Sequence, residues 1–254
     1  MFAVIFGALV GSFLNVVILR LPNEGESIVF PASHCPKCKG TIPWYDNVPV
    51  ISFLLLRGKC RFCRQSISWQ YPLVELLMGL LSGLLFVSRG FGIEFFVYFI
   101  FCAALLAIIF IDWRHQIIPD VISLSGIVFG FALSFVRPEV TWQESALGLC
   151  IGGGLFYAVA AGYYFFTRRA GMGGGDIKLL AMIGAFLGWQ ALPIVIFCSA
   201  FLGSIVGIGA MIQQQKGGKT VVPYGPFLAL ASYLYIFWGQ EILHYYERYM
   251  FGVI

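Results

Sequence analysis

The sequence contains few charged residues. Asp, Glu, Lys and Arg make up 11% of its 254 residues, whereas 59% are hydrophobic and the mean hydropathy is +0.87. Soluble domains carry about 25% charged residues, so this chain cannot cover itself with a polar surface and its expected solvent is lipid. The net charge of +4 forms no basic polar face, which argues against a nucleic-acid-binding protein.

Signature motifs of several enzyme classes are missing as well. No Gly-x-Ser-x-Gly sequence indicates a nucleophilic serine, and no His-Glu-x-x-His sequence indicates a catalytic zinc. A Rossmann glycine fingerprint is absent. The glycine run that ends at Gly175 lacks the preceding strand and the following Lys-Ser/Thr of a phosphate loop. Acidic side chains are therefore the remaining candidates for catalysis.

Long apolar runs recur along the chain with short interruptions. A membrane helix needs about 20 mostly apolar residues, so the runs predict an all-α, polytopic membrane bundle of about eight spans. The count is uncertain by one, because only Gly188, Trp189 and Gln190 separate the sixth expected span from the seventh. The expected spans are 2–19, 71–88, 93–111, 117–136, 144–166, 177–189, 190–212 and 223–240.

A polar stretch at 20–70 interrupts these runs and divides the chain. We expect a first span at 1–19, a small inserted domain at 20–70 and a membrane bundle at 71–254. Lys and Arg gather in the insertion and in the loops on its side of the membrane, including Lys216 and Lys219. Positive residues favour the cytosolic side, so the insertion is expected in the cytosol, against anionic lipid.

Three aspartates stand at the cytosolic ends of expected spans. Asp112 closes the third span, Asp120 opens the fourth after Pro119, and Asp176 opens the sixth after the glycine run. An ionisable residue at the end of a membrane helix must offset its desolvation, which favours a functional role. A helix cap is the alternative, equally supported for Asp120 and plausible for Asp176. The helix dipole disfavours a negative charge at the C-terminal position of Asp112.

Two carboxylates brought close together cannot both ionise and therefore share a proton. One then acts as general base on a water molecule and the other as general acid toward a carbonyl oxygen. Asp112 and Asp176 are the candidates for such an aspartic-protease pair. A proton-coupled transporter is the alternative, but it would place acids near mid-span and often show related halves.

Four cysteines form two Cys-x-x-Cys pairs in the insertion. The pairs, Cys35 with Cys38 and Cys60 with Cys63, have the spacing of a tetrahedral zinc site with four thiolate ligands. A site closed by four ligands is structural rather than catalytic. Disulfides are not expected in the cytosol, so unligated thiols are the alternative.

Several motifs resemble those of one family. Gly-Met-Gly-Gly-Gly-Asp at 171–176 resembles the GxGD signature of membrane aspartyl peptidases. The wider pattern resembles the type IV prepilin peptidases, whose motif order is matched by GSFLNVVILRLP at 11–22, the paired cysteines, YPLVE at 71–75, the segment 111–120 and PYGPF at 223–227. The resemblance covers nearly the whole chain.

This resemblance implies a function for the chain. It implies a multi-pass enzyme of the bacterial inner membrane, with Asp112 and Asp176 catalytic at the cytosolic face and Asp120 without an assigned role. The implied substrates are type IV prepilins and type II secretion pseudopilins, whose basic leader is cut after a glycine. The implied second activity is N-methylation of the new amino terminus with S-adenosylmethionine.

Methyl transfer has no local signature in the sequence. The resemblance places this activity near the cytosolic insertion, where Asn15, Arg20 and Glu75 are candidate residues. Each also has a structural interpretation. Asn15 would form an interhelical hydrogen bond, Arg20 would anchor its helix at the membrane edge, and Glu75 would pair with a nearby Arg. A peptidase without methyl transfer therefore remains the alternative.

Overall fold

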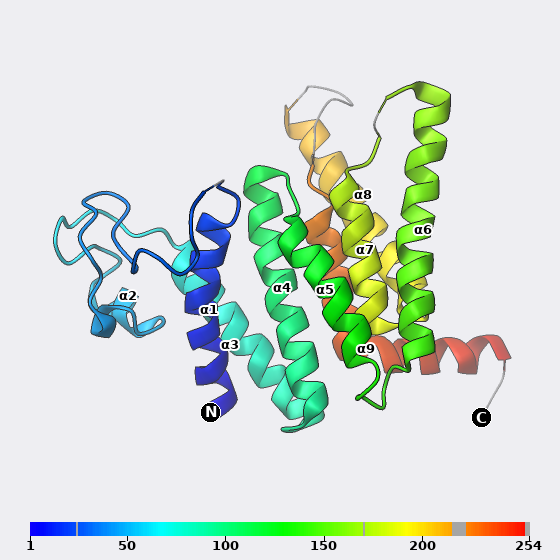
Figure 1. The fold of residues 1–254 in the computed structure, drawn as a ribbon, viewed down its shortest axis with the longest axis horizontal. Coiled ribbons are helices and arrows are strands. Elements are labelled where there is room, and N and C mark those ends of the chain that lie inside the picture. Colours follow the sequence, from blue (N-terminus) through cyan, green and yellow to red (C-terminus); the bar gives the residue numbers. More distant parts are fainter. Residues whose placement is uncertain (24, 170, 215–221, 252–254) are drawn as a thin grey trace. The chain divides into compact units, whose positions relative to one another are not determined.

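The computed structural model describes residues 1–23, 25–169, 171–214 and 222–251, and within these ranges every regular element is a helix (Figure 1). The insertion also contains two isolated β-bridges. The all-α prediction is therefore confirmed. The helices are α1 (Phe2–Arg20), η1 (Trp44–Asp46), α2 (Ile51–Leu55), α3 (Gln70–Arg89), α4 (Ile93–His115), α5 (Asp120–Leu133), α6 (Trp142–Thr167), α7 (Gly174–Leu187), α8 (Ala191–Gln214) and α9 (Gly225–Phe251).

Five helices in the described ranges are long and apolar enough to cross a membrane: α1, α3, α4, α6 and the segment Ala191–Ile212 of α8. This confirms a polytopic membrane protein, while the number of eight spans stays a prediction. The other three expected spans are helical too. However, α5 and α7 have only 14 residues each, and α9 is not among the five.

Several expected boundaries were wrong. Helix α4 does not end at Ile111 but continues to His115, so Asp112 lies in its last turn. The expected span 117–136 shortens to Asp120–Leu133, because Pro119 precedes the helix and cannot donate a backbone hydrogen bond. Helix α7 begins at Gly174, earlier than expected, which places Asp176 inside its first turn.

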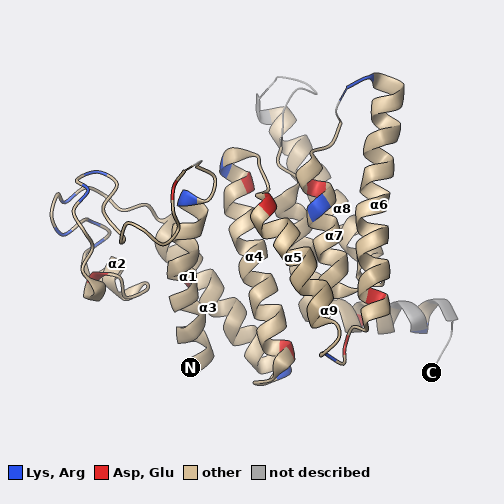
Figure 2. Ribbon diagram, in the orientation of Figure 1, with Lys and Arg blue, Asp and Glu red and all other residues tan. Residues whose placement is uncertain are grey.

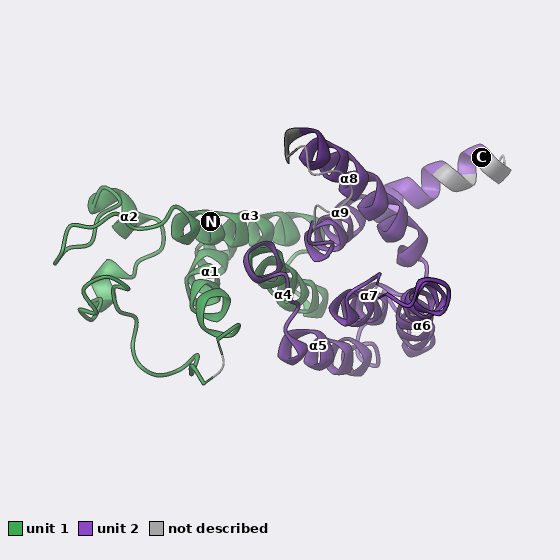
Figure 3. Cartoon of the chain, turned by 90° about the horizontal axis from the view of Figure 1, so that it is seen from above, with its two compact units in different colours: residues 1–111 green, residues 112–254 purple. Residues whose placement is uncertain are grey.

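The chain divides into two compact units, Met1–Ile111 and Asp112–Ile254 (Figure 3). In the first unit α1 packs along α3 through glycines. A Cβ atom on Gly11 would lie 2.8 Å from the Cα atom of Glu75, so only glycine allows the two backbones to approach this closely. The Ser82 hydroxyl donates a hydrogen bond of 2.7 Å to the Ala3 carbonyl and fixes the same pair of helices.

Helix α7 forms the centre of the second unit. All nine residues of 179–187 are buried, which explains why this short helix is apolar on every side. Helix α6 packs against it through Gly148 and Gly184, and α5 packs against it through Gly126 and Gly130, which face Met182 and Phe186. The position of Asp176 is thus set by a helix enclosed by its neighbours.

Charged residues gather in the insertion between α1 and α3 and near helix ends, whereas the middles of the helices carry few (Figure 2). This distribution fits helices that pass through an apolar solvent. Lys216 and Lys219, which contributed to the expected orientation, lie outside the described residues. The cytosolic orientation stays a prediction.

Candidate functional site

Asp112 is a buried carboxylate at the end of α4. Its residue is 5% exposed, and its Oδ2 atom accepts a hydrogen bond of 3.1 Å from the backbone N–H of Gly225. Gly225 is the first residue of α9, so a free N–H at a helix N-terminus faces the carboxylate. Such an N–H donor favours the ionised form and fixes the orientation of the carboxyl group.

Asp176 lies in the first turn of α7, after the N-cap residue Gly173. Burial, together with the charge of Asp112, raises the pKa of Asp176 to about 6, although a hydrogen bond from the Gly173 backbone acts in the opposite direction. The electrostatic effect of Asp112 means that the structure brings these two carboxylates within interaction range. The charge of Asp112 therefore disfavours ionisation of Asp176.

Two glycines adjoin the carboxylate pair, and both contact Ile118. A Cβ atom on Gly175 would lie 2.9 Å from the Ile118 Cβ atom. A Cβ atom on Gly225 would lie 2.6 Å from Asp112 Oδ2 and 3.1 Å from Ile118 Cδ1. Neither position has room for a side chain.

Asp120 does not cap α5. Pro119 is the N-cap residue, and no side-chain capping bond is present at this helix start. Asp120 Oδ1 instead pairs with Lys178 Nζ at 2.6 Å, which joins the start of α5 to α7. The capping interpretation was therefore wrong, and the aspartate makes an interhelical ion pair beside the site.

Sequence reasoning did not identify Gly225, Ile118 or Lys178 as parts of this site. Gly225 was identified only as a member of the 223–227 motif. Every residue except proline has a backbone N–H, so residue type does not indicate which N–H acts as a donor in a site. The available signal was the pair Pro223 and Pro226 around Tyr224 and Gly225, which is typical of a fixed turn before a helix. Tyr224 is also held, because its hydroxyl lies 2.7 Å from Ser199 Oγ.

The four cysteines of the insertion form one cluster. Their sulfur atoms all lie within 4.8 Å of one another, and Cys35 Sγ lies 3.9 Å from Cys63 Sγ. A tetrahedral zinc with bonds of about 2.3 Å places its sulfur ligands about 3.8 Å apart. The sequence-predicted set is therefore brought together at a separation that fits a metal.

Both Cys-x-x-Cys pairs fold into the same turn. The N–H of Lys39 bonds to Cys35 O at 2.8 Å, and the N–H of Arg64 bonds to Cys60 O at 3.0 Å. Lys39 and Arg64 each adopt a positive φ, 56° and 57°. The bridges His34–Thr41 and Lys59–Ser66 close the two turns in the same way.

Hydrogen bonds tune the cysteine thiols. Backbone hydrogen bonds from Cys63 and Phe62 lower the pKa of Cys60 to about 7. The backbone of Gln65 lowers the pKa of Cys63, but burial and the neighbouring thiols outweigh it and raise that pKa to about 11. A divalent cation bound by the four sulfur atoms would favour their thiolate forms.

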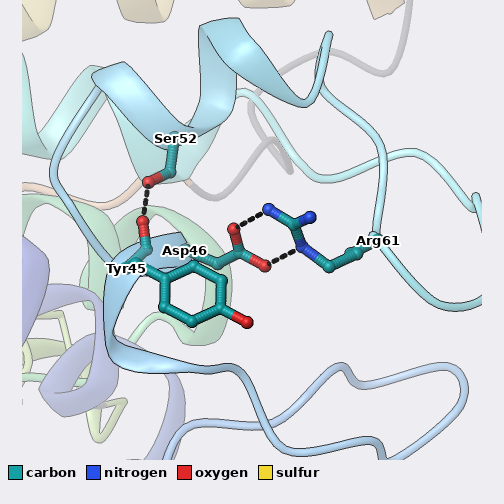
Figure 4. Close-up of polar contacts among 4 residues, drawn as sticks. All are labelled: Tyr45, Asp46, Ser52 and Arg61. Carbon is teal, nitrogen blue, oxygen red and sulfur yellow. Dashed lines mark hydrogen bonds and ion pairs between the residues drawn. The ribbon is translucent and has the colours of Figure 1, made fainter.

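An ion pair ties the second cysteine turn to the rest of the insertion (Figure 4). Arg61 Nε and Nη2 each donate to the Asp46 carboxylate at 2.6 Å, and the guanidinium lies 5.5 Å from the centre of the Tyr45 ring. The Ser52 hydroxyl donates to Tyr45 O at 3.0 Å. Asp46 therefore anchors the turn that carries Cys60 and Cys63 through Arg61.

Of the three candidates for methyl transfer, Asn15 joins α1 to α3, whereas Arg20 and Glu75 bind the insertion to these helices. Asn15 donates to Tyr71 O at 3.1 Å, which is the interhelical bond expected in its structural interpretation. Arg20 donates to Ser27 O and Pro31 O, at 3.0 and 2.9 Å.

Glu75 is bound to the insertion by a backbone group. It accepts a bond of 2.7 Å from the N–H of Val50, a residue with a φ of 60° at the start of α2. Glu75 thus bonds to the Val50 backbone and the Ser12 side chain, whereas the structural interpretation expected an arginine.

Comparisons with known proteins give the family of the chain. Residues 5–89 match the bacterial peptidase A24 N-terminal domain, and residues 99–208 match the type IV leader peptidase family. Proteins named prepilin leader peptidase/N-methyltransferase are similar over nearly the whole chain. The one from Pseudomonas putida is 36% identical over 261 residues (94% of this chain and 91% of the relative), and the one from Stutzerimonas stutzeri is 37% identical over 265 residues (94% and 91%).

A third relative of that name, from Pseudomonas aeruginosa, is 34% identical over 268 residues, 97% of this chain and 92% of the relative. No solved structure matches the chain. Identity at this level over the full length, together with the two family models, settles the relationship. The chain belongs to the type IV leader peptidase family.

Proposed function

We propose that this protein is a membrane-embedded aspartyl endopeptidase whose catalytic pair is Asp112 and Asp176. Its substrates would be type IV prepilins and type II secretion pseudopilins, whose basic leader is removed after a glycine. The observation that carries the proposal is a buried Asp112 oriented by the Gly225 N–H, whose charge acts on the half-buried Asp176. The names of the relatives support the substrate class.

The chemistry follows from one proton shared by two acids. In the singly protonated pair, the ionised carboxylate removes a proton from a water molecule as that water attacks the scissile carbonyl carbon. The protonated partner donates to the carbonyl oxygen as negative charge develops on it. Burial disfavours the charged form of both acids, and each accepts a backbone hydrogen bond, but the charge of Asp112 acts in addition on Asp176. We therefore assign Asp112 as the base and Asp176 as the acid.

The positions of the acids argue against a proton-coupled transporter. Asp112 lies in the last turn of α4, Asp120 is the first residue of α5, and Asp176 lies in the first turn of α7. A transporter would need ionisable groups nearer to mid-span. The excess of Lys and Arg on the side of the insertion supports a bacterial inner-membrane protein with the catalytic pair at the cytosolic face.

We propose methyl transfer as the second activity, because the relatives are named N-methyltransferases. When bound, S-adenosylmethionine would supply the methyl group from its sulfonium. In the described part of the chain, the buried Oδ1 of Asn15 and both side-chain polar atoms of buried Gln70 have no hydrogen-bond partner. Unpaired buried polar atoms are suited to a polar ligand. Gln70 lies in α3 with Glu75, and we propose Asn15, Arg20 and Glu75 as the residues that would hold the ligand.

The cysteine cluster is proposed as a structural zinc site. The donor set of Cys35, Cys38, Cys60 and Cys63, the sulfur separations and the repeated turns all suit zinc. With four protein ligands the metal would have no open position, so it would stabilise the insertion and take no part in catalysis.

The proposal is tested by mixing purified protein with a prepilin and measuring the loss of leader mass by mass spectrometry. Asp112→Asn and Asp176→Asn should each abolish cleavage, whereas Glu139→Gln, an exposed acid in the same unit, should cleave normally. The double Asp→Asn variant should still transfer a labelled methyl group to pilin that has already lost its leader. Cleavage by a folded Asp112→Asn or Asp176→Asn variant would remove that residue from the mechanism. Absence of label transfer by the unmodified protein would favour a peptidase alone.

A further inference from the structure

Ile118 lies between the two glycines that adjoin the catalytic aspartates. On one side its Cβ, Cγ1 and Cδ1 atoms lie 2.9, 3.4 and 3.5 Å from the position that a Cβ atom of Gly175 would take. On the other side its Cδ1 atom lies 3.1 Å from the corresponding position at Gly225. Gly175 directly precedes Asp176, and Gly225 donates its N–H to Asp112. One aliphatic side chain therefore contacts the backbone beside each acid.

The linker that carries Ile118 is fixed at both ends. At its start, Gln116 adopts a φ of 54° and its N–H bonds to the Asp112 carbonyl at 2.9 Å, which ends α4 in a tight turn. At its end, Asp120 pairs with Lys178 of α7 at 2.6 Å. Lys178 lies on the face of α7 that also carries Met182 and Phe186 toward α5. These contacts leave Ile118 little freedom to move away from the glycines.

We propose that Ile118 is a positioning residue that sets the separation of the Asp112 and Asp176 carboxylates. The inference rests on the proposed function, since it assigns Ile118 a role in that reaction. A close-packed aliphatic group transmits displacement because packed side chains resist compression. Ile118 thereby links the backbone before Asp176 to the N–H that orients Asp112.

The separation matters because the two acids must act on the same water and carbonyl. A carboxylate that moves by about 1 Å loses alignment with its reacting atom, which can reduce the rate on the order of 100-fold. Ile118 lies against the Gly175 and Gly225 positions, which adjoin the acids in the chain or by a hydrogen bond, and its side chain has no polar group to bind substrate or move a proton. Its loss should therefore reduce kcat and leave substrate affinity largely unchanged.

The first test compares kcat and KM for prepilin cleavage in Ile118→Val, Ile118→Ala and Ile117→Ala. Valine keeps the contact at Gly175 but loses the Cδ1 contact at Gly225, whereas alanine loses both Cγ1 and Cδ1. We expect kcat to fall about 10-fold for valine and about 100-fold for alanine, with KM within about threefold of the unmodified protein. Ile117 is 45% exposed, and its variant is the matched control with normal kcat.

A second pair of variants changes the same contact on its α7 side. These variants add a methyl group to a glycine and therefore create no cavity. Gly175→Ala would force Ile118 outward, whereas nothing lies within 4 Å of a Cβ atom added at Gly174. Both glycines are helical, so alanine fits the backbone at either position. We expect Gly175→Ala to lower kcat by about 10-fold or more and Gly174→Ala to leave it unchanged.

The outcomes separate this inference from the proposed function. Normal kcat in a folded Ile118→Ala variant, or an equal loss in Ile117→Ala, would overturn the positioning role while cleavage by the unmodified protein upholds the peptidase. A raised KM with unchanged kcat would make Ile118 a substrate contact and overturn the inference too. Failure of both Ile118→Ala and Gly175→Ala to accumulate as folded protein would reduce Ile118 to a structural residue. If the unmodified protein cleaves no prepilin, both proposals fall together.

Discussion

Replacement of Gly225 by alanine is expected to impair catalysis strongly while leaving the fold intact. The added Cβ atom would lie 2.6 Å from Asp112 Oδ2 and 3.3 Å from Asp112 Cγ. Ordinary van der Waals contact for a Cβ atom begins at 3.4 Å, so the carboxylate has to retreat by about 0.8 Å. The same movement lengthens the hydrogen bond from the Gly225 N–H, which is 3.1 Å before the change.

Two independent estimates give the same magnitude. A misplacement of roughly 1 Å at a reacting group reduces the rate on the order of 100-fold, or about 2.7 kcal/mol in activation free energy. Loss of a hydrogen bond to a charged group removes about 1.5–3 kcal/mol. These effects arise from one displacement and are not summed. Gly225 begins α9, where alanine is a better helix former, so the free energy of unfolding should change by less than about 1 kcal/mol.

The assay is kcat and KM for prepilin cleavage, with thermal unfolding of the same preparations. Gly207→Ala is the matched control, because it also replaces a helical glycine of the second unit and nothing lies within 4 Å of its added Cβ atom. We expect a normal rate for Gly207→Ala and a loss on the order of 100-fold for Gly225→Ala. A Gly225→Ala variant that cleaves at the normal rate would refute the role of this N–H in orienting Asp112.

Three further predictions concern protonation, the ion pair and the metal. Because burial and the charge of Asp112 raise the pKa of Asp176 to about 6, the proton of the acid is lost as pH rises through that value. The kcat/KM for cleavage should then fall about tenfold for each pH unit above it, and a flat profile between about pH 5 and 8 would contradict the shared proton. Asp120→Asn and Lys178→Met should each lower the free energy of unfolding by less than about 1 kcal/mol in urea titrations, because both side chains of the pair are partly exposed; a larger loss would assign the pair a greater role. Elemental analysis should find one zinc per chain that Cys60→Ser weakens, and absence of metal with all four thiols alkylated in the folded protein would exclude the site.

The apolar runs were sufficient to predict the helices but not their ends. Trp113, Arg114 and His115 are polar or amphipathic, so they ended the apolar pattern at Ile111, whereas the backbone hydrogen bonds of α4 continue through them. Helix boundaries depend on those bonds and on the following turn at Gln116 rather than on hydropathy. The prediction that Asp112 lies at the C-terminal end of its helix was unaffected, because the last turn of α4 contains it.

The candidate residues were predictable by type, but their partners were not. Pro119 followed by Asp120 is a local pattern typical of a helix start, yet the carboxylate pairs with Lys178, which is far away in sequence. The contacts of Ile118 likewise depend on which glycines the fold brings to it. Such pairings arise from tertiary packing, and one sequence carries no local record of them.

The location of each candidate group gives a physical reason to expect two separable chemistries. Asn15, Glu75 and the cysteine cluster all lie within Met1–Ile111, whereas Asp112, Asp176 and Gly225 all lie within Asp112–Ile254. The two matched family models also separate them: Asn15, Glu75 and the cysteines fall within 5–89, and Asp112 and Asp176 fall within 99–208. Peptide hydrolysis requires a shared proton and a water molecule, while methyl transfer requires an unprotonated amine aligned with a sulfonium carbon. Because neither set of groups serves the requirement of the other reaction, a change that removes the shared proton leaves the groups assigned to methyl transfer in place.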